Sequence, residues 1–271
     1  MNILEINKNI FNNMKNLFLE IYKFRNVLLQ LIRQYLRLKY RRTVFGYFWT
    51  LLNPLLILLV LGIVFSSLLK IDLEKFIFIL FAGLVPWNLF SQSIIQSLNT
   101  YINNEGLIKK IYIPKILFPL SVSLALVLDT IFFFIVTFPF MFFLGAKLSL
   151  AILVLPLALI LLFLFSLGLT IIGSITTVFF RDFQWLIPVL LQALFFLSPI
   201  IYDKGSVIGI LSLLNNLNPL SPFLELFKLP LLLGQFPSLS CWTLCLIFSL
   251  TSILVGLGFH IKLQKKIIYR L

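Results

Sequence analysis

The sequence predicts an all-α integral membrane protein with six transmembrane helices. Apolar residues make up 61% of the 271 residues and charged residues 11%, which leaves too little polar surface to cover a soluble globule. The apolar residues also gather in stretches that reach the roughly 20 residues a membrane-spanning helix needs. We predict spans at residues 44–69, 76–98, 116–144, 148–180, 183–201 and 239–261, which together form one transmembrane domain over residues 44–261.

The basic residues predict how these spans are oriented. Seventeen of the 22 Lys and Arg residues fall on the side of the two termini, and basic residues are retained on the cytoplasmic side of a membrane. We therefore expect both termini in the cytoplasm. The formal charge of +13 would suggest nucleic acid for a soluble chain, but beside apolar spans it meets anionic lipid head groups, so we expect membrane lipids and no nucleic acid as partners. The five other basic residues, on the opposite side, are Lys70, Lys75, Lys147, Lys204 and Lys228.

The N-terminal region, residues 1–43, precedes the first span and lacks the apolar core of a cleavable signal sequence. Residues 26–41 show helical periodicity, with polar residues on one face and apolar residues on the other. We predict an amphipathic helix in the membrane plane, with Lys39 snorkelling from its apolar face. A passive anchor and a partner-docking element both fit this pattern. The polar face holds Asn26, Gln30, Arg33, Gln34, Arg37 and Arg41.

The segment between the fifth and sixth spans, residues 202–238, is too apolar for an ordinary loop and too broken by Gly and Pro for a span. Two further spans would need about 40 residues. One further span would move the basic tail, residues 262–271, to the outer side, against the charge rule. We therefore predict two short helices at the outer face, separated by the sequence LNPLSP at 217–222.

Polar residues occur at membrane depth in three of the predicted spans. Asp129 lies near the centre of the third span, where a carboxylate costs about 2.5–3.5 kcal/mol. It should face protein or water, either as a proton-coupling or cavity-lining group or as an acid that holds neighbouring helices together. Asn88, Gln92 and Gln96 recur at helical spacing in the second span and should face a helix or an aqueous path. The fourth span carries a stripe of small residues suited to close helix packing: Ser166, Thr170, Gly173, Ser174 and Thr177.

The chain shows no catalytic or metal-binding set. It has no Gly-x-x-x-x-Gly-Lys-Ser/Thr phosphate loop, so any ATP would have to be handled by a partner. The single histidine, His260, is expected at the end of the last span, and no Ser-His-Asp, Cys-His or His-rich set is found. Cys241 and Cys245 lie one helical turn apart in an apolar span, where we expect them to pack. We expect this chain to bind no cofactor.

Three segments stand in an order and spacing that indicate a family. The first is YLRLKYRRTVFGYFWTLLNPLL at 35–56. The second combines LVPWNLF at 84–90 with GLIKKIYIPKILFPLS at 106–121. The third is FRDFQWLIPVLLQALFFLSPIIY at 180–202, which continues into LNPLSPFLELFKLPLL at 217–232. Together they resemble the membrane subunit of ABC-type polysaccharide exporters, the permeases that move O-antigen, capsule or teichoic acid chains on lipid carriers.

The resemblance implies a homodimer of six-span subunits in the bacterial cytoplasmic membrane, joined to separate ATPase subunits. Those partners would bind ATP and Mg and drive export of a lipid-linked glycan. The loop at 101–115 resembles the segment that couples the permease to the ATPase, although an ordinary positive-inside loop would carry the same basic residues. The coupling residues implied are Asn104, Glu105, Leu107, Ile108, Lys109, Lys110, Tyr112, Pro114 and Lys115.

By the same resemblance, the two short outer helices correspond to a periplasmic gate region, and aromatic residues near it are candidates for contact with sugar rings. The rival hypotheses are a proton-coupled secondary carrier that uses Asp129 and a non-transporting membrane scaffold. Internal inverted repeats would favour the carrier, and the sequence shows none. The candidate translocation path combines polar and aromatic residues: Asn88, Gln92, Gln96, Asp129, Trp87, Phe90, Phe195, Phe196 and Tyr202.

Overall fold

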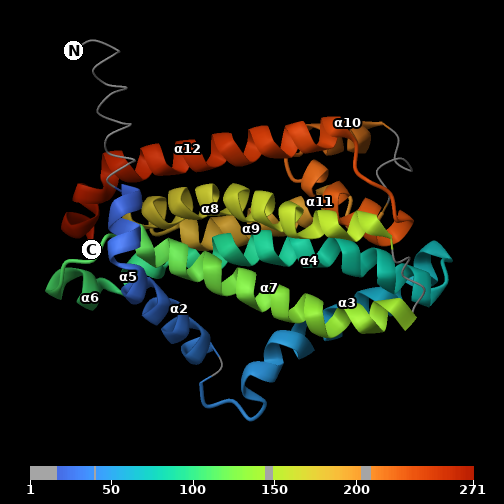
Figure 1. Cartoon of the computed structure of the whole chain (residues 1–271), viewed down its shortest axis with the longest axis horizontal. Coiled ribbons are helices and arrows are strands. Elements are labelled where there is room, and N and C mark those ends of the chain that lie inside the picture. Colours follow the sequence, from blue (N-terminus) through green and yellow to red (C-terminus); the bar gives the residue numbers. More distant parts are fainter. Residues whose placement is uncertain (1–16, 40, 144–148, 203–208) are drawn as a thin grey trace.

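Long apolar helices form the body of the protein, which confirms the predicted all-helical membrane class (Figure 1). The computed structural model describes residues 17–39, 41–143, 149–202 and 209–271. Within these residues, five helices are long and apolar enough to cross a membrane: α3 (Trp49–Leu69), α4 (Leu73–Ser97), α7 (Leu117–Phe143), α8 (Leu155–Phe179) and α12 (Leu239–Arg270). Some of our sequence predictions concern residues outside the described part of the chain. These are residues 1–16, Lys147 and Lys204.

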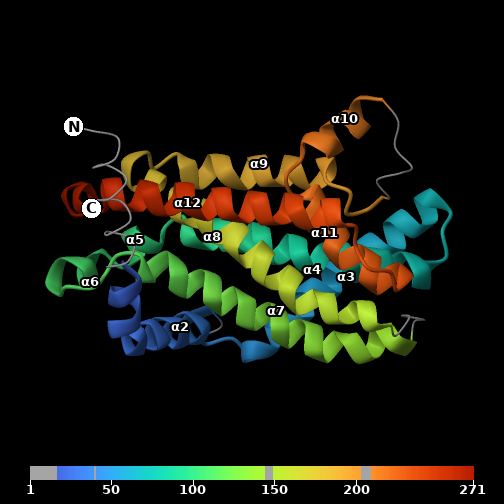
Figure 2. The same ribbon diagram turned by 45° about the horizontal axis from the view of Figure 1, so that its top comes forward.

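The bundle has two ends that carry different short elements (Figures 1 and 2). At one, which we call the α6 end, lie α5 (Thr100–Asn103), α6 (Glu105–Lys110) and the C-terminus of α12. At the other, the α10 end, lie the α3–α4 loop and α10 (Ile210–Leu217). Three further short elements are η2 (Leu150–Val154), α11 (Ser221–Lys228) and the π-helical turn η4 (Leu229–Leu233).

Helix α4 forms the centre of the bundle because it is apolar on almost every side. It packs against α3, α7, α8 and α11, and Phe76, Leu80 and Phe81 on it have no exposed surface. A helix without a polar face is stable only when other helices surround it or lipid covers it. Here the other helices enclose most of α4, and the residues left partly open include the polar Asn88, Gln92 and Gln96.

Helices α8 and α12 approach each other closely along their length. The Ser249 hydroxyl donates to the carbonyl of Leu161, and the Ser252 hydroxyl donates to the carbonyl of Phe165, both at 2.7 Å. A Cβ atom built on Gly168 would lie 2.3 Å from the backbone of Ser252. Small residues therefore bring these two backbones together, as is typical of helix pairs in membranes. All five residues of the predicted small-residue stripe on α8 are buried as well: Ser166, Thr170, Gly173, Ser174 and Thr177.

The fifth predicted span is shorter in the structure than in the sequence prediction. Helix α9 (Phe183–Leu197) has 15 residues, which correspond to about 22 Å of helix against a hydrocarbon core of about 30 Å. It ends at Leu197 because Ser198 precedes Pro199, and a residue before proline avoids the helical conformation. Helix α9 runs alongside α4 and α8 and buries only Leu191.

The segment that follows α9 folds back as two short helices. Helix α10 ends at Leu217 and α11 begins at Ser221, so a break falls at Asn218 and Pro219. The Asn218 side chain stabilises this break, since its amide group donates to Ser198 Oγ at 2.8 Å and its carbonyl oxygen accepts from the Leu220 N–H at 2.9 Å. The break thus attaches α11 to the end of α9.

The amphipathic helix predicted near the N-terminus is α2 (Arg25–Lys39). It packs obliquely against the first half of α7 (Figures 1 and 2), with Leu31 and Ile32 buried. A turn of 3₁₀ helix, η1 (Gly46–Phe48), then leads into α3. Helix α2 therefore lies on the outside of the bundle and ends beside α7.

Candidate functional site

A buried carboxylate on α7 binds two side chains from the N-terminal part of the chain. The Lys39 ammonium group lies 2.7 Å from Asp129 Oδ2, and the Tyr47 hydroxyl donates to Asp129 Oδ1. Lys39 is the last residue of α2, and Tyr47 lies in η1 just before α3. One carboxylate thus connects α7 to both elements that precede the bundle. Only 9% of the Asp129 side-chain surface is exposed, so an unpaired charge there would be costly.

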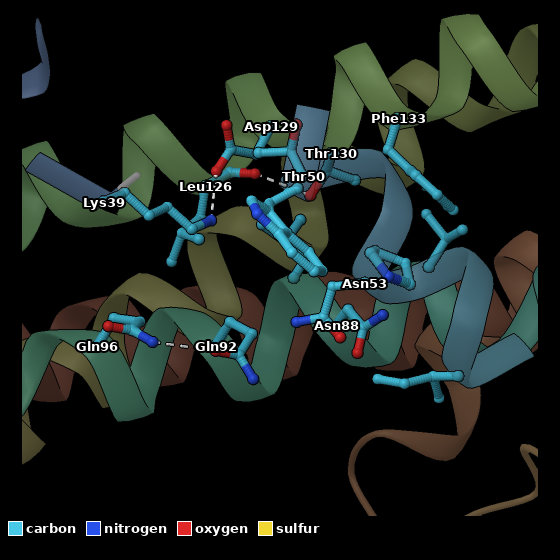
Figure 3. Close-up of a pocket in the computed structure, with 15 residues that line it drawn as sticks. Lys39, Thr50, Asn53, Asn88, Gln92, Gln96, Leu126, Asp129, Thr130 and Phe133 are labelled. Atoms are coloured by element: carbon cyan, nitrogen blue, oxygen red, sulfur yellow. Dashed lines mark hydrogen bonds and ion pairs between the residues drawn. The ribbon is translucent and has the colours of Figure 1, made fainter. Parts of the chain in front are cut away.

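A cavity of about 290 Å³ lies between α3, α4 and α7, next to this ion pair (Figure 3). Its α4 wall carries Asn88, Gln92 and Gln96, which stand one helical turn apart as the sequence predicts. Its α7 wall carries Asp129, and α3 contributes Asn53. The structure therefore brings together the four polar residues of the candidate translocation path. The remaining lining residues are Lys39, Trp49, Thr50, Pro54, Ile57, Val85, Leu89, Leu126, Thr130 and Phe133.

A second cavity, of about 460 Å³, lies between α2, α4, α5 and α7 on the α6 side of the first. Lys39 and Gln96 line both cavities, so the two spaces border each other. Asn103 and Asn104, at the junction of α5 and α6, form part of its wall, as does Gln34 of α2. The other lining residues are Leu31, Tyr35, Leu38, Thr100, Phe118, Ser121 and Val122.

Sequence reasoning missed Asn53 and Lys39, which line the cavities, and Tyr47, which donates to Asp129. Asn53 precedes Pro54 in an apolar span, and an amide at such a position is itself a signal that the first span faces something other than lipid. Lys39 lies in the segment that was predicted to be interfacial, and Tyr47 lies near the start of the predicted first span. Their contact with Asp129 depends on how α2 packs on α7, and nothing in the local sequence encodes it.

The aromatic residues of the candidate path lie away from both cavities. Trp87 and Phe90 of α4 are buried in the core, where Trp87 contacts Phe195 of α9 at a ring distance of 5.4 Å. Phe90 stacks on Phe165 of α8, and Phe165 stacks in turn on Phe223 of α11, with ring distances of 5.5 and 4.8 Å. These rings join α4, α8, α9 and α11.

The last two aromatic residues of the predicted path lie near the α10 end. Phe196 is 56% exposed on the surface of α9. The Tyr202 hydroxyl lies 3.2 Å from both the Asn215 side-chain oxygen and the Leu197 carbonyl, and burial raises the pKa of Tyr202. The structure thus separates the predicted path into polar residues at the cavities and aromatic residues elsewhere.

The predicted coupling segment forms two short helices at the α6 end. Helix α4 ends at Ser97. Asn104 separates α5 from α6, and the side-chain amide of Asn104 donates to the carbonyl of Thr100 at 2.8 Å. Within α6, Lys109 and Glu105 pair at 2.6 Å across one helical turn. Ile108 is buried, Leu107 is half-buried and Lys110 is exposed, so α6 has one face on the protein and one face free.

The chain that follows α6 contacts the N-terminal helix at residues 17–23. The Tyr112 hydroxyl donates to Glu20 at 3.2 Å, and the Tyr112 ring meets Phe24 edge to face. Partial burial and the adjacent Glu20 carboxylate raise the pKa of Tyr112. Burial lowers the pKa of Lys115, while Glu20 acts in the opposite direction. Pro114 precedes α7, and most of the Tyr112 side chain remains exposed.

No group of three or more His, Cys, Asp or Glu side chains gathers to hold a metal ion in the ranges 17–39, 41–143, 149–202 and 209–271. Cys241 and Cys245 are buried thiols in α12. The chemistry available at the two cavities is therefore that of amides, hydroxyls and one ion pair. Such groups bind and orient a polar ligand.

The long apolar helices are those of a multi-pass membrane protein. The chain belongs to the ABC-2 type transporter family, which matches residues 26–232. It is 28% identical over 192 residues to the O-antigen export system permease protein RfbA of Myxococcus xanthus, a match that covers 69% of this chain and 72% of that protein. It is 30% identical over 191 residues to a protein of the same name from Klebsiella pneumoniae, with the same coverage. The resemblance to the permeases of ABC-type polysaccharide exporters is thereby confirmed.

Proposed function

We propose that this chain is the membrane-spanning subunit of an ATP-driven exporter that moves a lipid-linked polysaccharide across the bacterial cytoplasmic membrane. The observation that carries the proposal is its membership of the ABC-2 family together with relatives named as O-antigen export permeases, aligned over 69% of the chain. The sequence contains no phosphate loop, so a separate ATPase subunit binds ATP and Mg and hydrolyses the nucleotide.

The position of the coupling segment, residues 101–115, between two helices that line the cavities supports this proposal. It links the end of α4 to the start of α7, and these two helices form the walls of both cavities. A partner that docks on the free face of α6 would therefore act on two cavity walls at once. Closure of the ATPase subunits would move α6 and shift the transmembrane helices between two arrangements. Tyr112 and Ile111, with 71% and 53% exposure, offer the apolar contact for docking.

A homodimer of six-span subunits with both termini in the cytoplasm completes the proposal. In this arrangement α9 is the fifth of the six spans, and its 15 helical residues are extended by Ser198 to Ile201 before the chain folds back into the short helices α10 and α11 at the outer face. Helices α3 and α9 expose rows of large apolar side chains, such as Leu56, Val60 and Val189. Surfaces of this kind suit contact with lipid or with a second copy of the chain.

The proton-coupled alternative finds less support in the geometry. Asp129 is paired with Lys39, and it is the one acidic residue among those that line the two cavities. Proton relays in membranes use chains of ionisable groups. The ion pair instead supports a structural and cavity-lining role for Asp129, and the variant Asp129→Asn should retain ATP-dependent export.

The experiment that tests the proposed function is crosslinking to a co-expressed ATPase. We would replace Cys241 and Cys245 with Ala, introduce a single cysteine at Leu107 or Tyr112, and purify the complex through a tag on this chain. Both positions should crosslink to a polypeptide that carries a nucleotide-binding phosphate loop, with Tyr112 the stronger because its side chain is 71% exposed.

The matched control is a cysteine at Lys75, which is exposed in the first turn of α4, next to the α3–α4 loop, and should give no such crosslink. The proposal is wrong if no ATPase co-purifies, or if Lys75 and Tyr112 crosslink to it equally.

A further inference from the structure

The two cavities are lined by an unusual number of side-chain amides for a site inside a membrane protein. Figure 3 shows Asn88, Gln92 and Gln96 along α4, with Asn53 of α3 facing them. The second cavity adds three more amides: Gln34, Asn103 and Asn104. We call this set of seven side chains the amide lining.

Most hydrogen-bonding capacity of the amide lining is unused within the described residues. Gln92 and Gln96 share one long contact of 3.3 Å, and Asn104 donates to a neighbouring carbonyl. For Asn53 and Asn88 the structure gives no side-chain hydrogen bond to any other described residue. Asn53 is exposed and Asn88 is half-buried, so both amides are open to a partner from outside the chain, and an amide that faced lipid without one would be costly. Such groups are expected where a polar ligand or water supplies the missing bonds.

The amide lining carries no net charge. Lys39 and Asp129 are the charged residues among those that line the two cavities, and they pair with each other at 2.7 Å. The cavity linings offer an anionic ligand no cation besides Lys39, and the ammonium group of Lys39 already contacts Asp129. A hydroxyl group both donates and accepts hydrogen bonds, as an amide does, so amides and hydroxyls satisfy each other without a charge.

We propose that the amide lining binds the sugar units of an uncharged, hydroxyl-rich glycan and discriminates against anionic polymers. This inference rests on the proposed export function and adds the chemical class of the substrate. The two cavity volumes, about 290 and 460 Å³, fall near the range of small-ligand pockets. The second cavity borders the coupling segment, so the glycan meets the amide lining on the side where α6 docks its partner.

The test is a binding titration with two defined probes. The full chain, purified with its ATPase in nanodiscs of uncharged phosphatidylcholine, is titrated with a neutral oligomer, maltoheptaose, and with an anionic oligomer of similar length, oligogalacturonate. Trp49 lines the first cavity and serves as the fluorescent reporter. We expect saturable quenching by maltoheptaose that is insensitive to salt, no quenching by oligogalacturonate, and loss of the signal in Trp49→Phe.

Variants locate the binding to the amide lining. The double variant Asn88→Leu, Gln92→Leu should bind maltoheptaose about tenfold more weakly, since each amide contributes hydrogen bonds that the ligand would lose. The control Gln184→Leu removes an amide from α9, outside both cavities, and should leave binding unchanged. Gln96→Lys adds an unpaired cation at an exposed position that borders both cavities, and should create salt-sensitive binding of oligogalacturonate.

Three results would overturn the inference. These are no saturable response to maltoheptaose, native binding of oligogalacturonate at equal strength, or equal losses in the double variant and in Gln184→Leu. Export of an anionic polymer by the complex with its ATPase would refute the neutral-glycan inference and leave the proposed function intact. If no ATPase co-purifies but maltoheptaose still binds, the proposed export function is refuted and the inference that the amide lining binds neutral glycans stands.

Discussion

Asp129 shows how one residue can organise distant parts of a membrane protein. Its carboxylate lies in the middle of the 27-residue helix α7, where an isolated charge is costly. Its partners, Lys39 and Tyr47, stand 90 and 82 residues earlier in the chain. The ion pair and the hydrogen bond reduce the cost of burying the carboxylate. They also fix where α2 ends and where α3 begins relative to α7.

A double-mutant cycle should reveal the coupling between Lys39 and Asp129. Lys39→Met leaves a buried carboxylate without its cation, and we expect a loss of about 1–3 kcal/mol in the free energy of unfolding, the cost of an unsatisfied buried polar group. The double variant Lys39→Met, Asp129→Asn should recover at least half of that loss, because neither charge then remains unpaired. Thermal unfolding of the purified chain in detergent measures both. Losses that simply add would show that the two side chains do not stabilise each other.

At the scale of single residues, sequence periodicity predicted the polar stripe but not its surroundings. Asn88, Gln92 and Gln96 share one helix, so a spacing of four residues was enough to place them on one face. The aromatic residues were assigned by their closeness to a span end, and that reasoning has no means of telling a ring that faces a path from one that faces the core. Trp87 and Phe90 are buried because α8, α9 and α11 happen to cover that side of α4.

At the scale of elements, the α8–α12 pair has the least tolerance for added volume. Gly168 lies against the backbone of Ser252, and a Cβ on Gly256 would lie 2.7 Å from the carbonyl oxygen of Gly168. Backbone atoms cannot move aside as a flexible side chain can. The hydroxyls of Ser249 and Ser252 also donate hydrogen bonds from α12 to α8. The backbone contacts disfavour a shorter distance between the two helices, and the hydrogen bonds disfavour a longer one.

Gly168→Ala should therefore destabilise the protein although alanine favours helices. We expect a loss of about 1–3 kcal/mol from overpacking, seen as a lower midpoint of thermal unfolding in detergent. The matched control is Gly258→Ala on α12, where a new Cβ would meet nothing within 4 Å. That variant should be neutral or gain up to about 1 kcal/mol from helix propensity. Equal behaviour of the two variants would contradict the packing described for α8 and α12.

The sequence predicted most of the long helices, but it predicted less well the residues at which they begin and end. Apolar length alone identified α3, α4, α7, α8 and α12, because about 20 apolar residues have few other stable arrangements. The sequence prediction extended the fifth span to Ile201, whereas α9 ends at Leu197, and Pro199 was the available signal. The oblique packing of α2 on α7 could not be read from an amphipathic pattern, which indicates a buried face without naming what covers it.

At the scale of the whole molecule, the proposed orientation predicts which positions a reagent can reach from outside the cell. In a chain with Cys241 and Cys245 replaced by Ala, a cysteine at Lys75 should react with a membrane-impermeant thiol reagent in intact cells. A cysteine at Lys265 should react only after permeabilisation. Both side chains are exposed, at opposite ends of the bundle, so a difference in labelling reports the membrane and not burial.

Lys75 is a better outer probe than Lys228, because the Lys228 ammonium group bonds the carbonyl of Tyr202 and its side chain is partly buried. Labelling of both positions 75 and 265 in intact cells would require an even number of crossings between them, which α4, α7, α8 and α12 supply without α9. It would then exclude α9 as a membrane-crossing helix.

The length of α12 has a consequence for how the protein sits in the bilayer. Its 32 residues correspond to about 48 Å of helix, so about 18 Å project beyond a hydrocarbon core of about 30 Å. The projecting part carries Lys262, Lys265, Lys266 and Arg270, and each cation near an anionic lipid surface contributes about 1 kcal/mol. Ile267 among them has no exposed surface and belongs to the buried cluster that contains Ile108 of α6. Because Ile267 packs this projection onto the bundle, we expect that in the proposed orientation lipid head groups attracting its charges would also fix how far α6 lies from the membrane surface.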